Sequence, residues 1–273
     1  MSPISDLRAY LLRPFMSSTS SRIEAAGFDE LGQKYGARII AADRPGYGWN
    51  SPHPDRTLLD HPKDLECLAK HLGLDEYCVL GISSGGPYAL ACAMALPREK
   101  LKCVSIVCGL GPPDIGMKGA DFVHWMGFTF GWRRYARPIF IRWFFQREPA
   151  ARLDLSDEKY LEFTQQLVAK SEATAHESDL KVFTLRKDVD FLRLYLRSVR
   201  ESYAQGFDWV TQDGRLVASG FGFRRRALMW GNLQLYMART TRAISRYAFL
   251  RVDISRSFLN MAGLLSSTGS TMR

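Results

Sequence analysis

The sequence predicts an α/β fold, a mostly parallel, doubly wound sheet with a helical cap inserted into it. Short apolar runs alternate with helical periods from residue 21 to residue 108, the alternation stops between about Gly111 and Gly222, and apolar runs return after Ala227. Strands and helices alternating at this spacing are typical of βαβ units, whose functional sites lie at the carboxyl ends of the strands. At 273 residues, a single domain with an insertion is expected.

The first part of the chain supplies three helix patterns and three strand patterns. The helices are expected at residues 21–35, 60–72 and 84–96, and the strands at residues 38–42, 76–80 and 101–108. Ser20 or Ser21 can cap the first helix, and Gly36 and Gly73 follow the first two, as glycine commonly does at a helix C-terminus. The strands are short apolar runs, which is typical of strands that are buried on both faces.

The middle of the chain predicts a cap, because amphipathic helical periods run through residues 111–222 without strand patterns between them. The clearest periods cover residues 159–174 and 191–203, and an aromatic, basic segment from Phe122 to Phe145 is expected to pack within the cap. Apolar runs at 227–231 and 248–252 predict the last two strands, with a helix between them. The expected core therefore comprises residues 1–110 and 223–273.

The formal net charge of +9 is concentrated near the C-terminus. From Arg224 onward the chain has nine arginines, no lysine and one acidic residue, Asp253. No zinc-finger, helix-turn-helix or aromatic RNA-binding motif accompanies this charge, so we expect a small-molecule substrate and no nucleic acid partner. A basic nucleic-acid or membrane-surface binder is a third hypothesis, which the arginine-rich C-terminal fifth alone supports.

Cysteine usage and the start of the chain bear on location. The five cysteines are odd in number and lack C-x-x-C or metal-like spacing, which predicts reduced structural thiols and no metal or cofactor. They are Cys67, Cys78, Cys92, Cys103 and Cys108. The segment from Met1 to Phe15 has no apolar signal core, and no uncharged run suits a bilayer span. We expect a cytoplasmic protein of unknown oligomeric state, with a loose peroxisomal ending as the alternative.

A G-x-S-x-G motif, Gly81-Ile82-Ser83-Ser84-Gly85, stands between a predicted strand and a predicted helix. A nucleophile elbow requires this setting, because the serine backbone adopts a strained conformation that points its hydroxyl above the sheet. Gly81 and Gly85 leave room for the neighbouring strand and helix to pack. Ser83 is therefore the predicted nucleophile, and the backbone N–H of Ser84, at the helix N-terminus, is the predicted oxyanion donor.

Three stretches of sequence resemble the α/β-hydrolase superfamily, especially fungal and bacterial members with helical lids. They are GISSGGPYALACAMALP at the elbow, DRPGYGWNSP upstream, and SYAQGFDWVTQDGRLVASGFGF near residues 202–223. The resemblance runs from about Ser20 to Trp230. It implies hydrolysis of an ester, thioester or related acyl bond of a small hydrophobic substrate through an acyl-enzyme, and some fungal relatives act in secondary-metabolite or toxin pathways.

The remaining catalytic machinery of this family is not at its expected positions. The family order is serine, acid, histidine, with the histidine after the last strand, where this sequence has Arg256, and arginine cannot act as a general base. Gln234 falls near the place of the acid, and Met16-Ser17 takes the place of the oxyanion-loop His-Gly pair. About 15 residues precede that loop, so the family's first hairpin is expected to be missing, as in a truncated or rearranged copy.

Other residues could complete the site. Asp114, just after the predicted strand 101–108, is the candidate acid, His124 could enter from the cap, and His53 lies on a loop at the carboxyl edge of the sheet. The other histidines, His61, His71 and His176, are expected at the surface. Asp43 and Arg44 are expected to fix their loop by hydrogen bonds.

A serine hydrolase with Ser83 as nucleophile is the leading hypothesis. The alternative, motivated by the missing histidine and acid, is a catalytically impaired pseudo-hydrolase with a binding or vestigial role.

Overall fold

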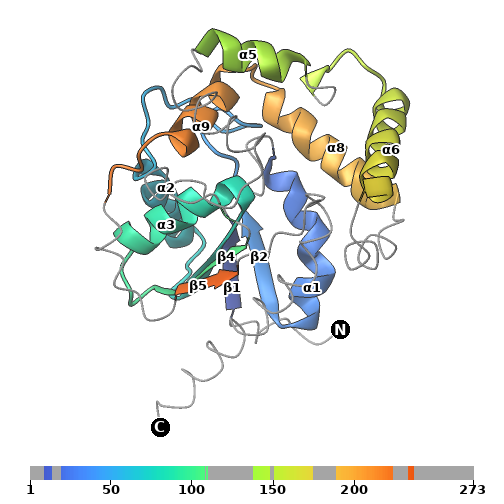
Figure 1. The fold of residues 1–273 in the computed structure, drawn as a ribbon. Helices are drawn as coiled ribbons and strands as arrows, with labels where there is room; N and C mark the ends of the chain where they lie inside the picture. The colour runs from blue at the N-terminus through green and yellow to red at the C-terminus, as the bar shows by residue number, and fades with distance from the viewer. Residues whose placement is uncertain are drawn as a thin grey trace.

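In the computed structural model, five strands form one sheet in the order β2-β1-β3-β4-β5 (Figure 1). The structure describes residues 9–13, 20–107, 109, 138–147, 151–174, 189–223 and 233–236. The strands are β1 (Ala9–Arg13), β2 (Ala37–Ala41), β3 (Tyr77–Ile82), β4 (Leu101–Val107) and β5 (Leu233–Tyr236). Each pair of neighbouring strands is parallel, which confirms the predicted parallel α/β architecture.

Strand β1 lies between β2 and β3, in a part of the sequence where no strand was predicted. Its Leu11 pairs with Ile39 of β2 on one side and with Cys78 of β3 on the other. A run of five residues has little periodicity of its own, so pairing with two more distant segments decides its conformation. Residues 1–8, which bear on the expected absence of the family's first hairpin, lie outside the described ranges.

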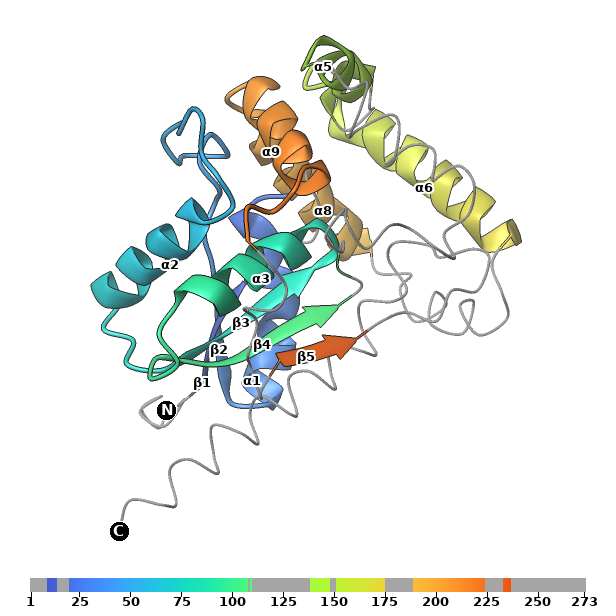
Figure 2. The same ribbon diagram turned by 60° about the vertical axis from the view of Figure 1, so that its left-hand side comes forward.

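Helices cover both faces of the sheet (Figures 1 and 2). Helix α1 (Asp29–Lys34) packs on β2, whereas α3 (Gly86–Ala95) packs on β3 and β4 of the other face, and α2 (Asp60–His71) packs on α3. Residues 86–93 of α3 are all buried, as expected for an apolar helix between a sheet and a second layer. An apolar cluster among the described residues joins these elements to Val217 and Phe221, which come from much later in the chain.

The helix predicted at residues 21–35 is divided into two elements. A 3₁₀ helix, η1 (Arg22–Phe28), precedes α1. Gly27 and Gly32 fall within the predicted range, and glycine lowers helix stability by about 1 kcal/mol relative to alanine. A Cβ atom at Gly32 would lie 2.6 Å from the carbonyl oxygen of Ala37, so this glycine lets α1 approach β2 closely.

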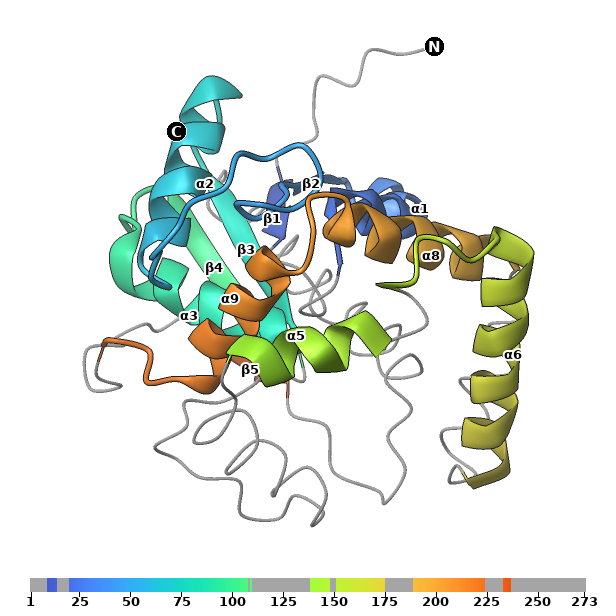
Figure 3. The same ribbon diagram turned by 90° about the horizontal axis from the view of Figure 1, so that it is seen from above.

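Four helices gather on the side of the sheet toward which β3 and β4 point, and we refer to them as the upper helices (Figures 2 and 3). They are α5 (Pro138–Arg147), α6 (Asp157–Thr174), α8 (Val189–Tyr203) and α9 (Asp208–Ala218). Helices α6 and α8 confirm the periods predicted at 159–174 and 191–203. A second apolar cluster, which includes Tyr47, Tyr160 and Leu196, packs α6 and α8 against the loop after β2. Among the described helices, none combines the length and hydropathy needed to cross a bilayer.

Strand β5 follows the run at residues 227–231 that was predicted to be a strand. Gln234, which fell near the family's acid position, lies inside β5 and pairs with Ser105 of β4. The predicted strands at 227–231 and 248–252 fall outside the described residues. Strand β5 lies between them, where a helix was predicted, because pairing with β4 gives this short run its extended conformation.

Candidate functional site

The Ser83 elbow forms the sharp turn between β3 and α3. Ser83 has a φ of +52°, in the left-handed region that costs energy for any residue with a side chain. A Cβ atom at Gly81 would lie 2.6 Å both from the Ala89 side chain and from the carbonyl oxygen of Gly85, so glycine is required where strand and helix meet. The structure therefore places Ser83 at the carboxyl end of β3 in the backbone conformation that a nucleophile elbow requires.

Ser84 follows in the 3₁₀ turn Ser83–Gly85, directly before α3. The first backbone N–H groups of a helix have no intrahelical acceptors, and they carry the positive end of the helix dipole. The Ser84 side chain is buried, and its hydroxyl has no hydrogen-bond partner among the described residues. This position is compatible with a backbone N–H donated to a developing oxyanion beside Ser83.

Three histidines lie in the described ranges, and one of them, His61, is buried although it was predicted to lie at the surface. His53 and His71 are exposed, whereas His61, expected at the surface, is only 6% exposed. The prediction for His61 was wrong because residue 61 is one helical turn before Leu65 and therefore lies on the buried face of α2. Burial, followed by the charges of Arg56 and Arg44, lowers the pKa of His61 to about 3.

No histidine in the described part of the chain is hydrogen-bonded to Ser83. His61 packs against Tyr88 of α3, with ring centroids 5.0 Å apart. A neutral imidazole with such a low pKa is a weak proton acceptor near neutral pH. The remaining predicted site positions, Asp114, His124, Arg256 and the segment 16–17, lie outside the described residues, as does His176.

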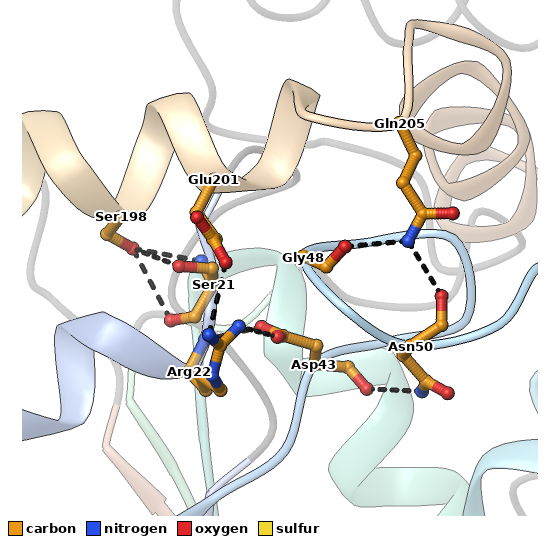
Figure 4. A network of polar contacts seen from close by, with 8 residues as sticks. All are labelled: Ser21, Arg22, Asp43, Gly48, Asn50, Ser198, Glu201 and Gln205. Carbon is orange, nitrogen blue, oxygen red and sulfur yellow. Dashed lines mark hydrogen bonds and ion pairs between the residues drawn. The ribbon is translucent and has the colours of Figure 1, made fainter.

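Arg22, at the start of η1, connects three segments of the chain (Figure 4). Its backbone N–H donates to Asp43 Oδ1 at 2.7 Å, and its guanidinium pairs with Asp43 Oδ2 and, at 3.1 Å, with Glu201 of α8. Asn50 Nδ2 donates to the Asp43 carbonyl oxygen at 2.7 Å. These contacts confirm that Asp43 fixes the loop after β2.

The end of α8 is hydrogen-bonded to the same loop and to the residue before η1 (Figure 4). Gln205 Nε2 donates to the carbonyl oxygens of Gly48 at 2.7 Å and Asn50 at 2.9 Å. The backbone N–H of Ser21 donates to the hydroxyl of Ser198 at 2.9 Å. These polar contacts join the upper helices to the carboxyl edge of the sheet.

Trp49 projects from the middle of this loop and is 86% exposed. The guanidinium of Arg22 lies 4.3 Å from the centre of its ring system, a cation–π geometry. Gly46, three residues earlier, has a φ of +82°, and a Cβ atom there would collide with the ring of Trp209 of α9. Glycine is therefore required both for the turn and for the close approach of α9.

A buried ionic cluster centred on Asp213 of α9 was missed by sequence reasoning. Asp213 Oδ2 forms an ion pair with Arg44 Nη1 at 2.6 Å, Oδ1 pairs with Arg56, and Tyr88 Oη of α3 donates to Oδ1 at 2.8 Å. The side chains of Arg44 and Asp213 are fully buried, and that of Arg56 is 2% exposed. Arg44 thus fixes its loop, as expected, although through a salt bridge to a helix far along the sequence.

The spacing within α9 contains a signal for this cluster. Asp213 lies between Val210 and Val217 at three- and four-residue steps, on the face of α9 that packs inward. An ionised carboxylate on an apolar face needs a cationic partner. Sequence reasoning could therefore have anticipated a buried arginine opposite Asp213, but not which arginine.

The described cysteines are free thiols, as predicted. Cys67 is exposed, and Cys78, Cys92 and Cys103 are buried. Hydrogen bonding with Cys103, followed by burial, raises the pKa of Cys78, and burial raises that of Cys92. Within the described ranges, no group of three or more histidine, cysteine or acidic side chains could hold a metal ion.

The chain belongs to the α/β hydrolase fold family, whose model matches residues 18–214. This match includes the elbow, the loop after β2 and the cluster around Asp213. The family assignment agrees with the parallel sheet and with the position of Ser83 between β3 and α3.

Solved structures share this fold at low sequence identity. An α/β hydrolase fold protein from Nakamurella multipartita has a TM-score of 0.52 and 17% identity, with 96% of this chain and 93% of that chain covered. A proposed epoxide hydrolase from Pseudomonas aeruginosa has a TM-score of 0.54 and 15% identity, with 97% and 90% covered. MenH from S. aureus has a TM-score of 0.50 and 13% identity, with 95% of each chain covered. At these identities the similarity establishes the fold alone.

Proposed function

We propose that the protein is a serine hydrolase that cleaves an ester, thioester or related acyl bond of a small hydrophobic substrate, with Ser83 as the nucleophile. The observation that carries the proposal is the left-handed backbone of Ser83, with a φ of +52° at the turn from β3 into α3. Such strain persists only where the surrounding structure enforces it, and it is typical of functional positions. Ser83 is also partly exposed, unlike its neighbours Ile82 and Ser84.

The reaction proceeds in two steps. The Ser83 hydroxyl attacks the acyl carbon and gives its proton to a general base, while the backbone N–H of Ser84 donates to the oxyanion of the tetrahedral intermediate. Collapse of the intermediate breaks the bond to the alcohol or thiol, which leaves with a proton and forms the acyl-enzyme. A water molecule then attacks the acyl carbon, and the carboxylic acid is released as Ser83 regains its proton.

We propose Asp114 as the acid that orients the base, and residues 111–222 as the cap that encloses the substrate. Asp114 follows the end of β4 in sequence, and the carboxyl ends of neighbouring parallel strands meet at one edge of a sheet. The position of the upper helices over that edge supports the cap assignment (Figure 2). Activity in the cytoplasm, within secondary metabolism, is part of the same proposal.

A second candidate is a catalytically impaired pseudo-hydrolase that binds a ligand without turning it over. One observation favours it: among the described histidines, none is hydrogen-bonded to Ser83, and the buried one has a pKa near 3. A serine without a base is a poor nucleophile at neutral pH. Loss of triad members in serine hydrolases leaves only a small residual rate from binding and the oxyanion hole.

Labelling with a fluorophosphonate probe tests the first proposal. Wild-type protein is expected to gain one adduct, mapped by mass spectrometry to the peptide that contains Ser83, and Ser83→Ala is expected to gain none. Ser219→Ala, which changes an exposed serine at the end of α9, serves as the matched control and should be labelled like wild type. Correctly folded wild-type protein that is never labelled would reject the serine hydrolase.

Turnover of a short p-nitrophenyl ester separates the two candidates. A steady-state rate that Ser83→Ala abolishes supports the enzyme and rejects the pseudo-hydrolase. A wild-type rate equal to that of Ser83→Ala, together with a rise in Tm on addition of a hydrophobic ester, supports the pseudo-hydrolase. Asp114→Asn should lower kcat at least tenfold if Asp114 orients the base, by analogy with the large effect of losing the triad acid.

A further inference from the structure

The cluster around Asp213 brings four segments of the chain to one buried point. Arg44 comes from the loop after β2, Arg56 from the loop before α2, Tyr88 from α3 and Asp213 from α9. Tyr88 lies five positions after Ser83, in the first turn of the helix that begins at the elbow. One hydrogen bond of 2.8 Å therefore links an upper helix directly to α3, the helix that follows the turn with the proposed oxyanion donor.

We propose that Tyr88 and Asp213 are positioning residues, through which α9 sets the orientation of α3 and hence of the Ser83 elbow. This inference rests on the proposed function, because it assigns the two residues a part in the reactivity of Ser83. It assigns a positioning role to two residues, one of them in an upper helix, that act through the orientation of α3 and not by contact with the substrate or the reacting atoms.

The Tyr88 hydroxyl can orient α3 because the rest of this helix offers few polar groups. The helix reads GPYALACAMA, so Tyr88 carries its only hydroxyl, and residues 86–93 are buried. Apolar burial is a non-directional interaction. A hydrogen bond from a phenol to a buried carboxylate is short and directional. The bond to Asp213 thus adds a directional constraint on the orientation of α3 to that of its apolar packing.

The carboxylate of Asp213 is itself held firmly in place. Two guanidinium groups, of Arg44 and Arg56, contact its two oxygens. Trp209, one helical turn earlier on the same face of α9, packs on Gly46, where a Cβ atom would lie 2.6 Å from the Trp209 Cβ. Helix α9 therefore has a fixed position relative to the loop after β2, and the Tyr88 hydroxyl couples α3 to it.

A purely structural role would lower stability without changing the reactivity of Ser83, so the test separates these effects. Tyr88→Phe removes the hydroxyl while Arg56 and Arg44 still neutralise Asp213, and it keeps the ring that contacts His61. Tyr77→Phe is the matched control: Tyr77 is also fully buried, and its hydroxyl has no hydrogen-bond partner among the described residues.

Inactivation by a fluorophosphonate would be measured at a temperature at which circular dichroism shows all variants folded. Tyr88→Phe is expected to lower the limiting inactivation rate about tenfold, with the half-saturating concentration changed less than about twofold, because small displacements at a reacting centre cost rate. Tyr77→Phe should match wild type. A Tyr88→Phe protein with a lower Tm but a wild-type inactivation rate overturns the inference and leaves the proposed function intact.

If wild type is not labelled, the proposed function is rejected. Hydrogen exchange then tests separately whether α9 orients α3. If α9 orients α3, Tyr88→Phe will raise amide exchange in the first turn of α3 and in α9 together, and Tyr77→Phe will raise it in neither. Unchanged exchange in α3 would overturn the coupling.

Discussion

The hydroxyl of Ser198 accepts a 2.9 Å hydrogen bond from the backbone N–H of Ser21, although 177 positions separate the two residues. Both residues are buried, and both lie where α8 crosses the start of η1 (Figure 4). Ser198 is thus an acceptor for a backbone donor that is shielded from water. Its contribution can be measured by removing a single oxygen atom.

Ser198→Ala should lower the free energy of unfolding by about 1–3 kcal/mol, because it leaves the buried N–H of Ser21 without this acceptor. Urea denaturation followed by circular dichroism measures the change. Ser219→Ala, at an exposed position, is expected to have little effect. Equal stability of Ser198→Ala and wild type would mean that another group accepts this hydrogen bond.

Replacing Ser83 with glycine should separate stability from function at the elbow. Glycine adopts a φ of +52° without a steric penalty, so Ser83→Gly is expected to be about 1 kcal/mol more stable than Ser83→Ala, which keeps the penalty. Neither variant should react with a fluorophosphonate. Thermal unfolding of the two purified variants provides the comparison, and a Ser83→Gly protein no more stable than Ser83→Ala would argue against backbone strain.

Asp213→Asn should be among the most destabilising substitutions in the chain. Removing one charge leaves two buried guanidinium groups, of Arg44 and Arg56, without their shared counter-ion, a loss of about 3–5 kcal/mol in comparable buried ion pairs. Asp208→Asn in the same helix is the matched control, since Asp208 is 69% exposed in its pair with Arg142 and should matter little. Similar midpoints of chemical denaturation for the two variants would contradict this account.

The buried His61 should make stability fall as the pH is lowered. Its pKa is lowered to about 3 in the folded protein, so the unfolded chain binds a proton near pH 6.5 while the folded protein does not. The contribution of His61 to the free energy of unfolding is therefore complete above about pH 6.5. It declines toward pH 3, by up to about 1.4 kcal/mol per pH unit. Unfolding of wild type and His61→Phe at pH 7 and pH 5 gives the test.

The pH-dependent loss of stability between those two values should be about 2 kcal/mol larger in wild type than in His61→Phe, if His61 remains neutral in the folded protein. His71→Phe, at an exposed position of the same helix, controls for the substitution itself. Parallel pH profiles for wild type and His61→Phe would show that His61 is protonated in the folded protein.

Local patterns explain why much of the fold could be predicted. Strands β2, β3 and β4 and helices α2 and α3 were predicted within a few residues of their observed bounds, since each has its own apolar period and glycine boundary. The Ser83 elbow could be recognised for the same reason: its glycines, the preceding strand and the following helix are contiguous in sequence. The burial of His61 also had a local signal, its spacing from Leu65, which was overlooked.

Other features had only partial signals in the sequence. The acid on the inward face of α9 could have indicated a buried cation, but it was overlooked. Arg56 and Asp213 are 157 positions apart, and nothing in the loop before α2 distinguishes Arg56 from a solvated arginine. Strand β1 has only five residues, which is too short a run to show a sequence period. Its strand conformation comes from pairing with β2 and β3 on its two sides.

Local sequence was enough to predict the alternation of strands and helices from β2 to β4 and the identity of the elbow serine, because both depend on residues that are neighbours in the chain. The place of β1 between β2 and β3, and the meeting of Asp213 with Arg44, Arg56 and Tyr88, became visible only in the folded structure. These features depend on free energies of burial and pairing between distant segments, which exist only once the chain has folded.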